Sequence, residues 1–285
     1  YACLSGSGFY NRAEGFRYVY ALANAGGTDA ATLYGSAGND TLLARPEYTY
    51  MYGSSFHNCA EGFQYVNAYA ITGGTDRAYL RDSSGNDAFV ATPAYANLSG
   101  SGFNNRADGF RYVYAQSTAG GTDAAVLHDS VGNDAYVATP TSARLSGSTF
   151  HNQVDGFRYV YAHATAGGMD QATFYDSAGN DTLLARPEYT YMYGSSFHNY
   201  AGGFRQVYAH ATAGGTDRAY LRDSVGDDRL NAAGDLAQLI YGDGSSVSVY
   251  GFVWVQAASV AGGTDTKHVE TIDYVLSTIG PWVDV

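Results

Sequence analysis

Three short motifs recur along this 285-residue chain at one constant interval of 47 residues. The first is a Gly-Phe pair, the second is G-G-T-D, and the third is a turn of the form S-x-G-[ND]-D. Repeats of this length are typical of solenoids, propellers and repeat arrays, in which each unit needs its neighbours to bury a core. The Gly-Phe pairs are Gly15-Phe16, Gly62-Phe63, Gly109-Phe110, Gly156-Phe157, Gly203-Phe204 and, one residue late, Gly251-Phe252.

A longer period of three repeats is superimposed on the first. Residues 36–58 reappear without change as residues 177–199. We interpret this identity as the duplication of a three-repeat block, and we expect the parent protein to be longer than this chain.

Within each repeat, apolar residues alternate with variable ones, which is the pattern of a strand with one buried face. Ala31, Leu33 and their equivalents are always apolar, whereas the column that begins at Thr32 varies between Thr, Tyr and Val. A second inward column follows the aspartate turn and consists of Leu42, Phe89, Tyr136, Leu183 and Leu230. With turns rich in Gly, Ser, Asn and Asp between them, four short strands fit each repeat.

The sequence therefore predicts an all-β fold, a parallel β-solenoid (β-helix) of about six repeats over residues 1–265. Equivalent residues such as Val19, Val66 and Val113 are expected to stack on one another in the interior. Each repeat forms either one large coil or two smaller coils. Residues 266–285 are expected to cap the last coil. A helical spacing favours a helix in this cap, through Val269, Ile272, Val275, Leu276 and Ile279.

The chain is acidic and poor in charged residues. Charged residues make up 15% of the chain, and the net charge is −12. This charge argues against a nucleic-acid partner, because phosphates require a basic face. No apolar run approaches the roughly 18 residues of a membrane helix. The two cysteines, Cys3 and Cys59, carry no spacing signature and are expected to be isolated thiols, with a single bridge between them as the alternative.

The aspartate turns carry the candidate metal chemistry. The segment G-S-A-G-N-D-T-L at residues 35–42 resembles the calcium-binding nonapeptide of RTX β-rolls. The resemblance implies calcium as the candidate cofactor, bound by carboxylate oxygens at the end of each turn. The residues concerned are Asp40, Asp87, Asp134, Asp181 and Asp228. In later repeats Asp82, Asp129, Asp176 and Asp223 replace the first Gly, and an ordinary aspartate-stabilised turn is the alternative.

Three further columns of polar or aromatic residues run through the repeats. The histidines form two columns, His57/His151/His198 and His163/His210, which we interpret as polar surface positions rather than metal ligands. Tyrosines share one strand face at Tyr48, Tyr50 and Tyr52 and again at Tyr189, Tyr191 and Tyr193. They either bind sugar rings or partner chains, or stack as a stiffening ladder. Asn11, Asn58, Asn105, Asn152 and Asn199 either form an amide ladder or mark turns.

Every repeat offers the same residues, and no G-x-S-x-G, H-E-x-x-H or Walker motif occurs, so we expect no enzymatic activity. The phrases G-F-R-Y-V-Y-A, A-G-G-T-D and S-A-G-N-D-T resemble giant bacterial surface or secreted proteins of tandem β-solenoid repeats, including adhesins. The resemblance implies an extracellular structural or adhesive rod that assembles with itself into fibres or binds glycans and cell-surface components. The alternative is a polysaccharide-binding or polysaccharide-processing β-helix.

Overall fold

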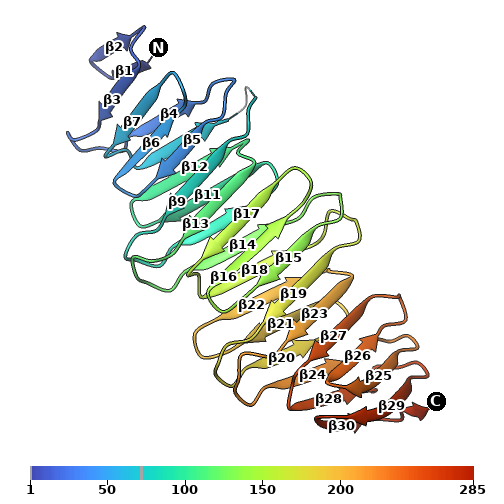
Figure 1. The fold of residues 1–285 in the computed structure, drawn as a ribbon. Coiled ribbons are helices and arrows are strands. Elements are labelled where there is room, and N and C mark those ends of the chain that lie inside the picture. The colour runs from blue at the N-terminus through green and yellow to red at the C-terminus, as the bar shows by residue number, and fades with distance from the viewer. Residues whose placement is uncertain (1, 71–72) are drawn as a thin grey trace. The chain divides into compact units, whose positions relative to one another are not determined.

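The computed structural model describes residues 2–70 and 73–285, so the repeat positions of Tyr1, Ile71 and Thr72 lie outside it. The described residues form strands and turns, and no helix. Coils that stack through parallel strand pairs confirm the predicted all-β solenoid (Figure 1). The chain divides into two compact units, Tyr1–Ala125 with Thr149–Gly156, and Val126–Ser148 with Phe157–Val285.

Two sheets build the first unit, beside a small β1–β2 hairpin. Its strands are β1 (Ala2–Gly6), β2 (Phe9–Ala13), β3 (Tyr18–Leu22), β4 (Ala30–Tyr34), β5 (Thr41–Ala44), β6 (Tyr48–Tyr52), β7 (His57–Glu61), β8 (Tyr65–Tyr69), β9 (Arg77–Arg81), β10 (Ala88–Ala91), β11 (Tyr95–Gly100), β12 (Phe103–Asp108), β13 (Tyr112–Gln116) and β17 (His151–Asp155). The sheet orders are β3-β7-β6-β5-β9-β13-β17 and β10-β11-β12-β8-β4. Strand β14 (Ala124–His128) crosses the sequence boundary between the units.

The second unit repeats this arrangement. Its strands are β15 (Ala135–Ala138), β16 (Ser142–Ser146), β18 (Tyr159–His163), β19 (Gln171–Tyr175), β20 (Thr182–Ala185), β21 (Tyr189–Tyr193), β22 (His198–Gly202), β23 (Gln206–His210), β24 (Arg218–Arg222), β25 (Arg229–Gly234), β26 (Leu236–Ile240), β27 (Ser246–Tyr250), β28 (Trp254–Ala258), β29 (Thr266–Ile272), β30 (Val275–Ile279) and β31 (Val283–Asp284). The sheet orders are β16-β15-β19-β23-β27-β26-β25-β29-β31 and β30-β28-β24-β20-β21-β22-β18.

The chain passes back and forth between the two sheets of each unit. In the first unit, β5, β6 and β7 form an antiparallel meander in one sheet, β8 lies in the other, and β9 returns to the first. The next meander, β10 to β12, then lies in the opposite sheet. Each such repeat has five strands rather than the predicted four, because the segment that begins at His57 forms a strand of its own. In each repeat the chain thus visits the sheets three times: the meander lies in one sheet, the fourth strand in the other, and the fifth strand in the first again. Two such passes complete one coil, so a repeat makes one and a half coils, and neither predicted coil number is right.

The predicted stacking of Val19, Val66 and Val113 on one another is wrong. Because three passes are an odd number, equivalent residues of successive repeats lie in opposite sheets. Val66 pairs instead with Ala31 on one side and with Asn105 on the other. Positions that stack in one sheet are about 36 residues apart, while the sequence repeat remains 47.

The inward columns lie where the alternation places them. Ala78 and Leu80 on β9 are fully buried, and the side chain of Tyr79 between them faces outward. The second column, Leu42, Phe89, Tyr136, Leu183 and Leu230, is at most 1% exposed. This strict period of two gives each strand one apolar face, and stacking the strands in two sheets buries that face.

The asparagine column has neither of its two predicted roles. Its buried members Asn105, Asn152 and Asn199 each donate Nδ2 to a backbone carbonyl 60 residues earlier, at 2.9–3.0 Å. The acceptors are the carbonyls of Arg45, Thr92 and Thr139, where the first hairpin of a meander turns. An amide ladder is impossible, since asparagines 47 residues apart do not share a sheet.

The predicted C-terminal helix is also wrong. The apolar residues from Val269 to Ile279 lie on β29 and β30, which pair in parallel with β25 and β28. A bulge between Ala232 and Gly234 shifts the register of β29, and this irregular step imitates a helical spacing. The segment therefore supplies the outermost strands of both sheets of the second unit, and its capping role stays a prediction.

Both cysteines are free thiols. Cys3 is exposed, whereas Cys59 is buried on β7. The expectation of isolated thiols is confirmed, and neither side chain cross-links the coils.

Candidate functional site

Stacking brings two motifs together that are distant in sequence. The backbone N–H of Asp40, at the end of the S-x-G-N-D turn, donates to Oδ1 of Asp76 in the following G-G-T-D motif at 2.6 Å. Beside it, the N–H of Thr75 donates to Oδ1 of Asn39 at 2.8 Å. The same aspartate bond recurs for Asp87 with Asp123, Asp134 with Asp170, Asp181 with Asp217, and Asp228 with Asp265. The two motifs are visible in the sequence, but their contact depends on the stacking of positions that lie 36 residues apart.

Each turn aspartate also closes its own turn. Asp134 accepts the backbone N–H of Ser130 at 2.7 Å and the Ser130 hydroxyl at 2.8 Å. Asp87 accepts the same two groups from Ser83. These bonds fit the alternative interpretation, an aspartate-stabilised turn.

A third aspartate, which replaces the first Gly of the turn in later repeats, lies beside this pair. Asp129 accepts the N–H of Ala166 at 2.9 Å, and Asp176 accepts the N–H of Ala213 at the same distance. In the described part of the chain this produces two groups whose carboxylate oxygens lie within 4.8 Å of one another. The groups are Asp129, Asp134 and Asp170, and Asp176, Asp181 and Asp217, and all six side chains are buried.

The five predicted calcium residues therefore differ in the number of carboxylates beside them. All five are buried, at 1–3% exposure, but the acidic trios found in the described residues contain only Asp134 and Asp181. Asp40 has no trio because Gly35 stands where the third aspartate would be. Carboxylate oxygens are suitable calcium ligands, so calcium binding at these trios stays a prediction.

The trios concentrate negative charge in the interior. Burial raises the pKa of Asp170 above its ordinary value, and the neighbouring carboxylates of Asp129 and Asp134 raise it further. Burial raises the pKa of Asp217 in the same way, with Asp176 and Asp181 beside it. A proton or a cation shared between these carboxylates would relieve the repulsion.

Aromatic and histidine side chains cover the outward faces of the strands. The ring of His198 lies 5.3 Å from the ring of Tyr191 and 6.0 Å from that of Tyr161, measured between centroids. His57 makes the equivalent contact with Tyr50 at 5.3 Å. Burial among these rings lowers the pKa of His198. The histidines therefore pack within aromatic rows, and the acidic trios of the described residues contain no histidine.

The predicted sharing of one face by the tyrosines is confirmed. Thr49 and Met51 on β6 are 0% exposed, while the tyrosines on either side of them face outward. The ring centroids of Tyr48 and Tyr50 lie 5.0 Å apart and the ring planes are tilted by 57°, so the two rings contact each other without stacking. Tyr52 is still 41% exposed, which leaves ring surface for a partner.

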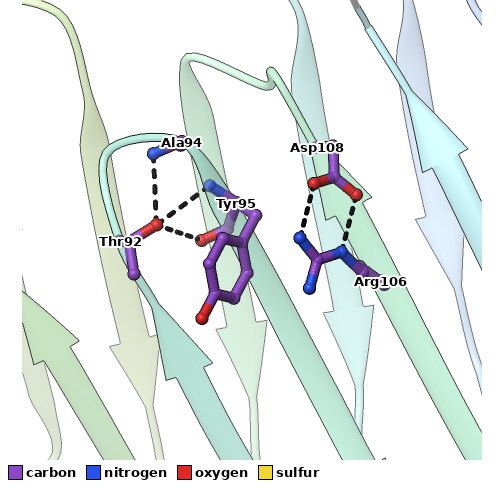
Figure 2. Close-up of polar contacts among 5 residues, drawn as sticks. All are labelled: Thr92, Ala94, Tyr95, Arg106 and Asp108. Carbon is purple, nitrogen blue, oxygen red and sulfur yellow. Dashed lines mark hydrogen bonds and ion pairs between the residues drawn. The ribbon is translucent and has the colours of Figure 1, made fainter.

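One outward cluster combines an aromatic ring with an ion pair (Figure 2). Arg106 on β12 donates from Nε and Nη2 to the two carboxylate oxygens of Asp108, both at 2.8 Å, and its guanidinium carbon lies 4.1 Å from the centroid of the Tyr95 ring. At the start of the hairpin, the Thr92 hydroxyl accepts the N–H groups of Ala94 and Tyr95. Sequence reasoning missed this cluster, although the spacing of Arg106 and Asp108 by two places them on one strand face.

Comparisons with known proteins return no relative: no family model, no curated protein and no solved structure matches the chain. Within the described residues, no helix has the length and apolar character to cross a membrane.

Proposed function

We propose that the protein is a non-catalytic structural or adhesive β-solenoid, secreted or displayed on a bacterial surface, whose repeated aromatic faces bind its partner. The observation that supports this proposal is the recurrence of half-exposed tyrosine rings on outward faces in both units. Tyr34 is 61% exposed, Tyr65 is 49% exposed and Tyr175 is 41% exposed. Tyrosine offers a broad apolar ring with a polar tip, which suits contact with sugars and with protein surfaces.

Repetition favours adhesion over catalysis. Catalysis requires one constellation of groups with distinct roles, whereas these faces present the same residue types from one repeat to the next. Contacts that are weak individually become strong when several engage one partner together. A second copy of the chain, a glycan or a cell-surface component would each offer such a repeated partner.

The motif resemblance to giant bacterial surface proteins supports the same proposal. Those proteins are built from tandem β-solenoid repeats, as this chain is. An extracellular location and fibre formation are the parts of the proposal that depend most on this resemblance.

The alternative is a polysaccharide-binding or polysaccharide-processing protein. Its support is the same exposed tyrosines, because aromatic rings pack well against the apolar faces of sugar rings. Binding without turnover would make the protein a carbohydrate-binding adhesin, while turnover would make it an enzyme.

The test combines turnover, binding and self-association on the whole chain. We expect no release of reducing ends from a panel of neutral and acidic polysaccharides. We expect retention on at least one of them, or concentration-dependent association measured by light scattering. Substitution of Tyr189, Tyr191 and Tyr193 together by Ser should weaken whichever contact is found by about tenfold or more, since aromatic anchors dominate such interfaces.

The matched control is Val131→Ser, which removes an apolar side chain that is 83% exposed and outside the aromatic rows. It should leave binding unchanged. Release of products from any polysaccharide would overturn the non-catalytic proposal, and an unaffected triple Ser variant would remove the tyrosine face from it.

A further inference from the structure

One pair of outward positions on β22 differs from its equivalents in other repeats. In three repeats, two residues on the same strand face form a polar contact at these positions. These pairs are Arg12 with Glu14, Arg106 with Asp108, and Gln153 with Asp155. On β22 the equivalent residues are Tyr200 and Gly202. An aromatic ring and a glycine thus replace the polar pair.

The ring of Tyr200 lies over this glycine. A Cβ built on Gly202 would be 2.8 Å from both Cε1 and Oη of Tyr200. Gly202 is the register partner of Tyr189 on β21. The ring centroids of Tyr189 and Tyr200 lie 5.6 Å apart, and the ring planes are 26° apart. Because Gly202 has no side chain, an ortho carbon of the Tyr200 phenol is held next to the residue opposite Tyr189.

This placement suits the coupling of two phenols. Tyr189 and Tyr200 are diagonal neighbours, because Tyr200 itself pairs in register with Tyr191. Diagonal side chains start about 7 Å apart, which leaves room for two rings to join edge to edge, whereas directly opposite ones start only about 5 Å apart. The side chains of Tyr189 and Tyr200 are half-buried, so a small oxidant can reach both rings.

We propose that Tyr189 and Tyr200 are a modification site, at which one-electron oxidation joins the two side chains as dityrosine. Each phenol loses one electron and its hydroxyl proton, and the two phenoxyl radicals form a carbon–carbon bond between their Cε atoms. Each coupled carbon then releases its hydrogen as a proton, and each oxygen regains a proton. The pair therefore loses two hydrogen atoms in all. Hydrogen peroxide, acting through a peroxidase-type catalyst, accepts the two electrons and two protons and becomes two water molecules.

The link would be a covalent bond between neighbouring strands of a chain whose two cysteines are free thiols. It would fix β21 to β22 beside the ring of Tyr193, which is 40% exposed. This site goes beyond the proposed function, because adhesion through aromatic rings requires no covalent bond between them.

The experiment treats the full chain, at low concentration, with hydrogen peroxide and a peroxidase, and locates the product by peptide mass spectrometry. We expect a link between Tyr189 and Tyr200 with the loss of two hydrogen atoms, together with the fluorescence of dityrosine. Tyr200→Phe should abolish this link, because phenylalanine forms no phenoxyl radical. Gly202→Glu should lower its yield severalfold, because a side chain at this position displaces the Tyr200 ring.

The duplicated block supplies a matched control. Tyr48 corresponds to Tyr189, but Cys59 and Glu61 occupy the places of the second tyrosine and the glycine. Cys59→Tyr combined with Glu61→Gly should therefore create a dityrosine link to Tyr48. Cys59→Tyr alone should give less of this link. Thermal unfolding before oxidation shows whether each variant is folded.

Three results would overturn the site. The first is no link between Tyr189 and Tyr200 under conditions that couple free tyrosine added to the same mixture. The others are a dityrosine yield that Tyr200→Phe does not change, and a yield that Gly202→Glu does not change. The outcome is separate from that of the proposed function, because Tyr200→Phe leaves the three tyrosines of the triple variant intact and the link is detected by mass rather than by binding.

Discussion

Single residues set the spacing of the stacked turns. The second glycine of each G-G-T-D motif lies directly on the preceding turn: a Cβ on Gly215 would overlap the carbonyl oxygen of Gly179, and its φ is +97°. The first glycine, Gly214, also has a positive φ, of +114°, but its nearest neighbour, the Ala178 carbonyl, is 3.9 Å away. One glycine is required by backbone conformation, and the other by conformation and close approach together.

These two glycines give a prediction about stability. Gly214→Ala should cost about 1–2 kcal/mol, the cost of a left-handed conformation for a residue with a Cβ. Gly215→Ala should cost about 1–3 kcal/mol more, because the added methyl group must displace the backbone of the turn below. Urea unfolding of the two variants measures the difference. Equal losses would show that the turns do not stack as closely as described.

At the scale of strands, the sequence predicts which side chains face inward but not how strands stack. The column from Leu42 to Leu230 is correct because burial depends only on the alternation within a strand. Stacking depends on the number of passes in a repeat. The sequence does not show how many strands each pass contains, and the segment at His57 pairs antiparallel with the preceding strand instead of forming a turn. Motif spacing carries no signal for such pairing.

The candidate sites, too, could be predicted only in part. The aspartate columns are visible in the sequence, but the contact of Asp134 with Asp170 depends on the stacking of positions 36 residues apart. The exchange at the last meander could have been noticed in the sequence, because Tyr241 and Ser245 break a Gly and Phe pattern that earlier repeats keep. The burial of the Tyr241 ring could not, because it depends on how the neighbouring turns pack around it.

The aromatic rows give a prediction about pH. Burial lowers the pKa of His198 below its ordinary value of 6.5. A histidine with a lower pKa in the folded protein binds fewer protons there than in the unfolded chain, so stability falls as the pH drops through about 6.5. The parent should lose thermal stability between about pH 8 and about pH 5, and His198→Asn should lose less.

Asparagine is a matched replacement here, since Asn104 occupies the equivalent position in another repeat. The pKa of the His198 imidazole should also be measured directly by NMR. A value at or above the ordinary one, or the same pH dependence in parent and variant, would mean that the aromatic row does not bury this ring.

For the molecule as a whole, the distribution of buried charge is one-sided. Every charged side chain that is buried in the described residues is an aspartate, and the whole chain carries a net charge of −12. The backbone N–H groups of the turns offset part of this charge, but the acidic trios retain oxygen lone pairs that these bonds do not use. An ion that binds only the folded chain would stabilise all coils that contain a trio.

Calcium is the cation that this arrangement predicts, and thermal unfolding tests it. Calcium at about 100 times its dissociation constant would stabilise the folded chain by about 2.7 kcal/mol per site, so the midpoint should rise with calcium and fall with a chelator. Replacing Asp129 and Asp176 together by Asn keeps an acceptor for the Ala166 and Ala213 N–H groups and removes one carboxylate from each trio. This variant should lose most of the calcium effect while it stays folded in chelator. Equal midpoints with calcium and chelator at low salt would mean that the aspartates serve the turns alone.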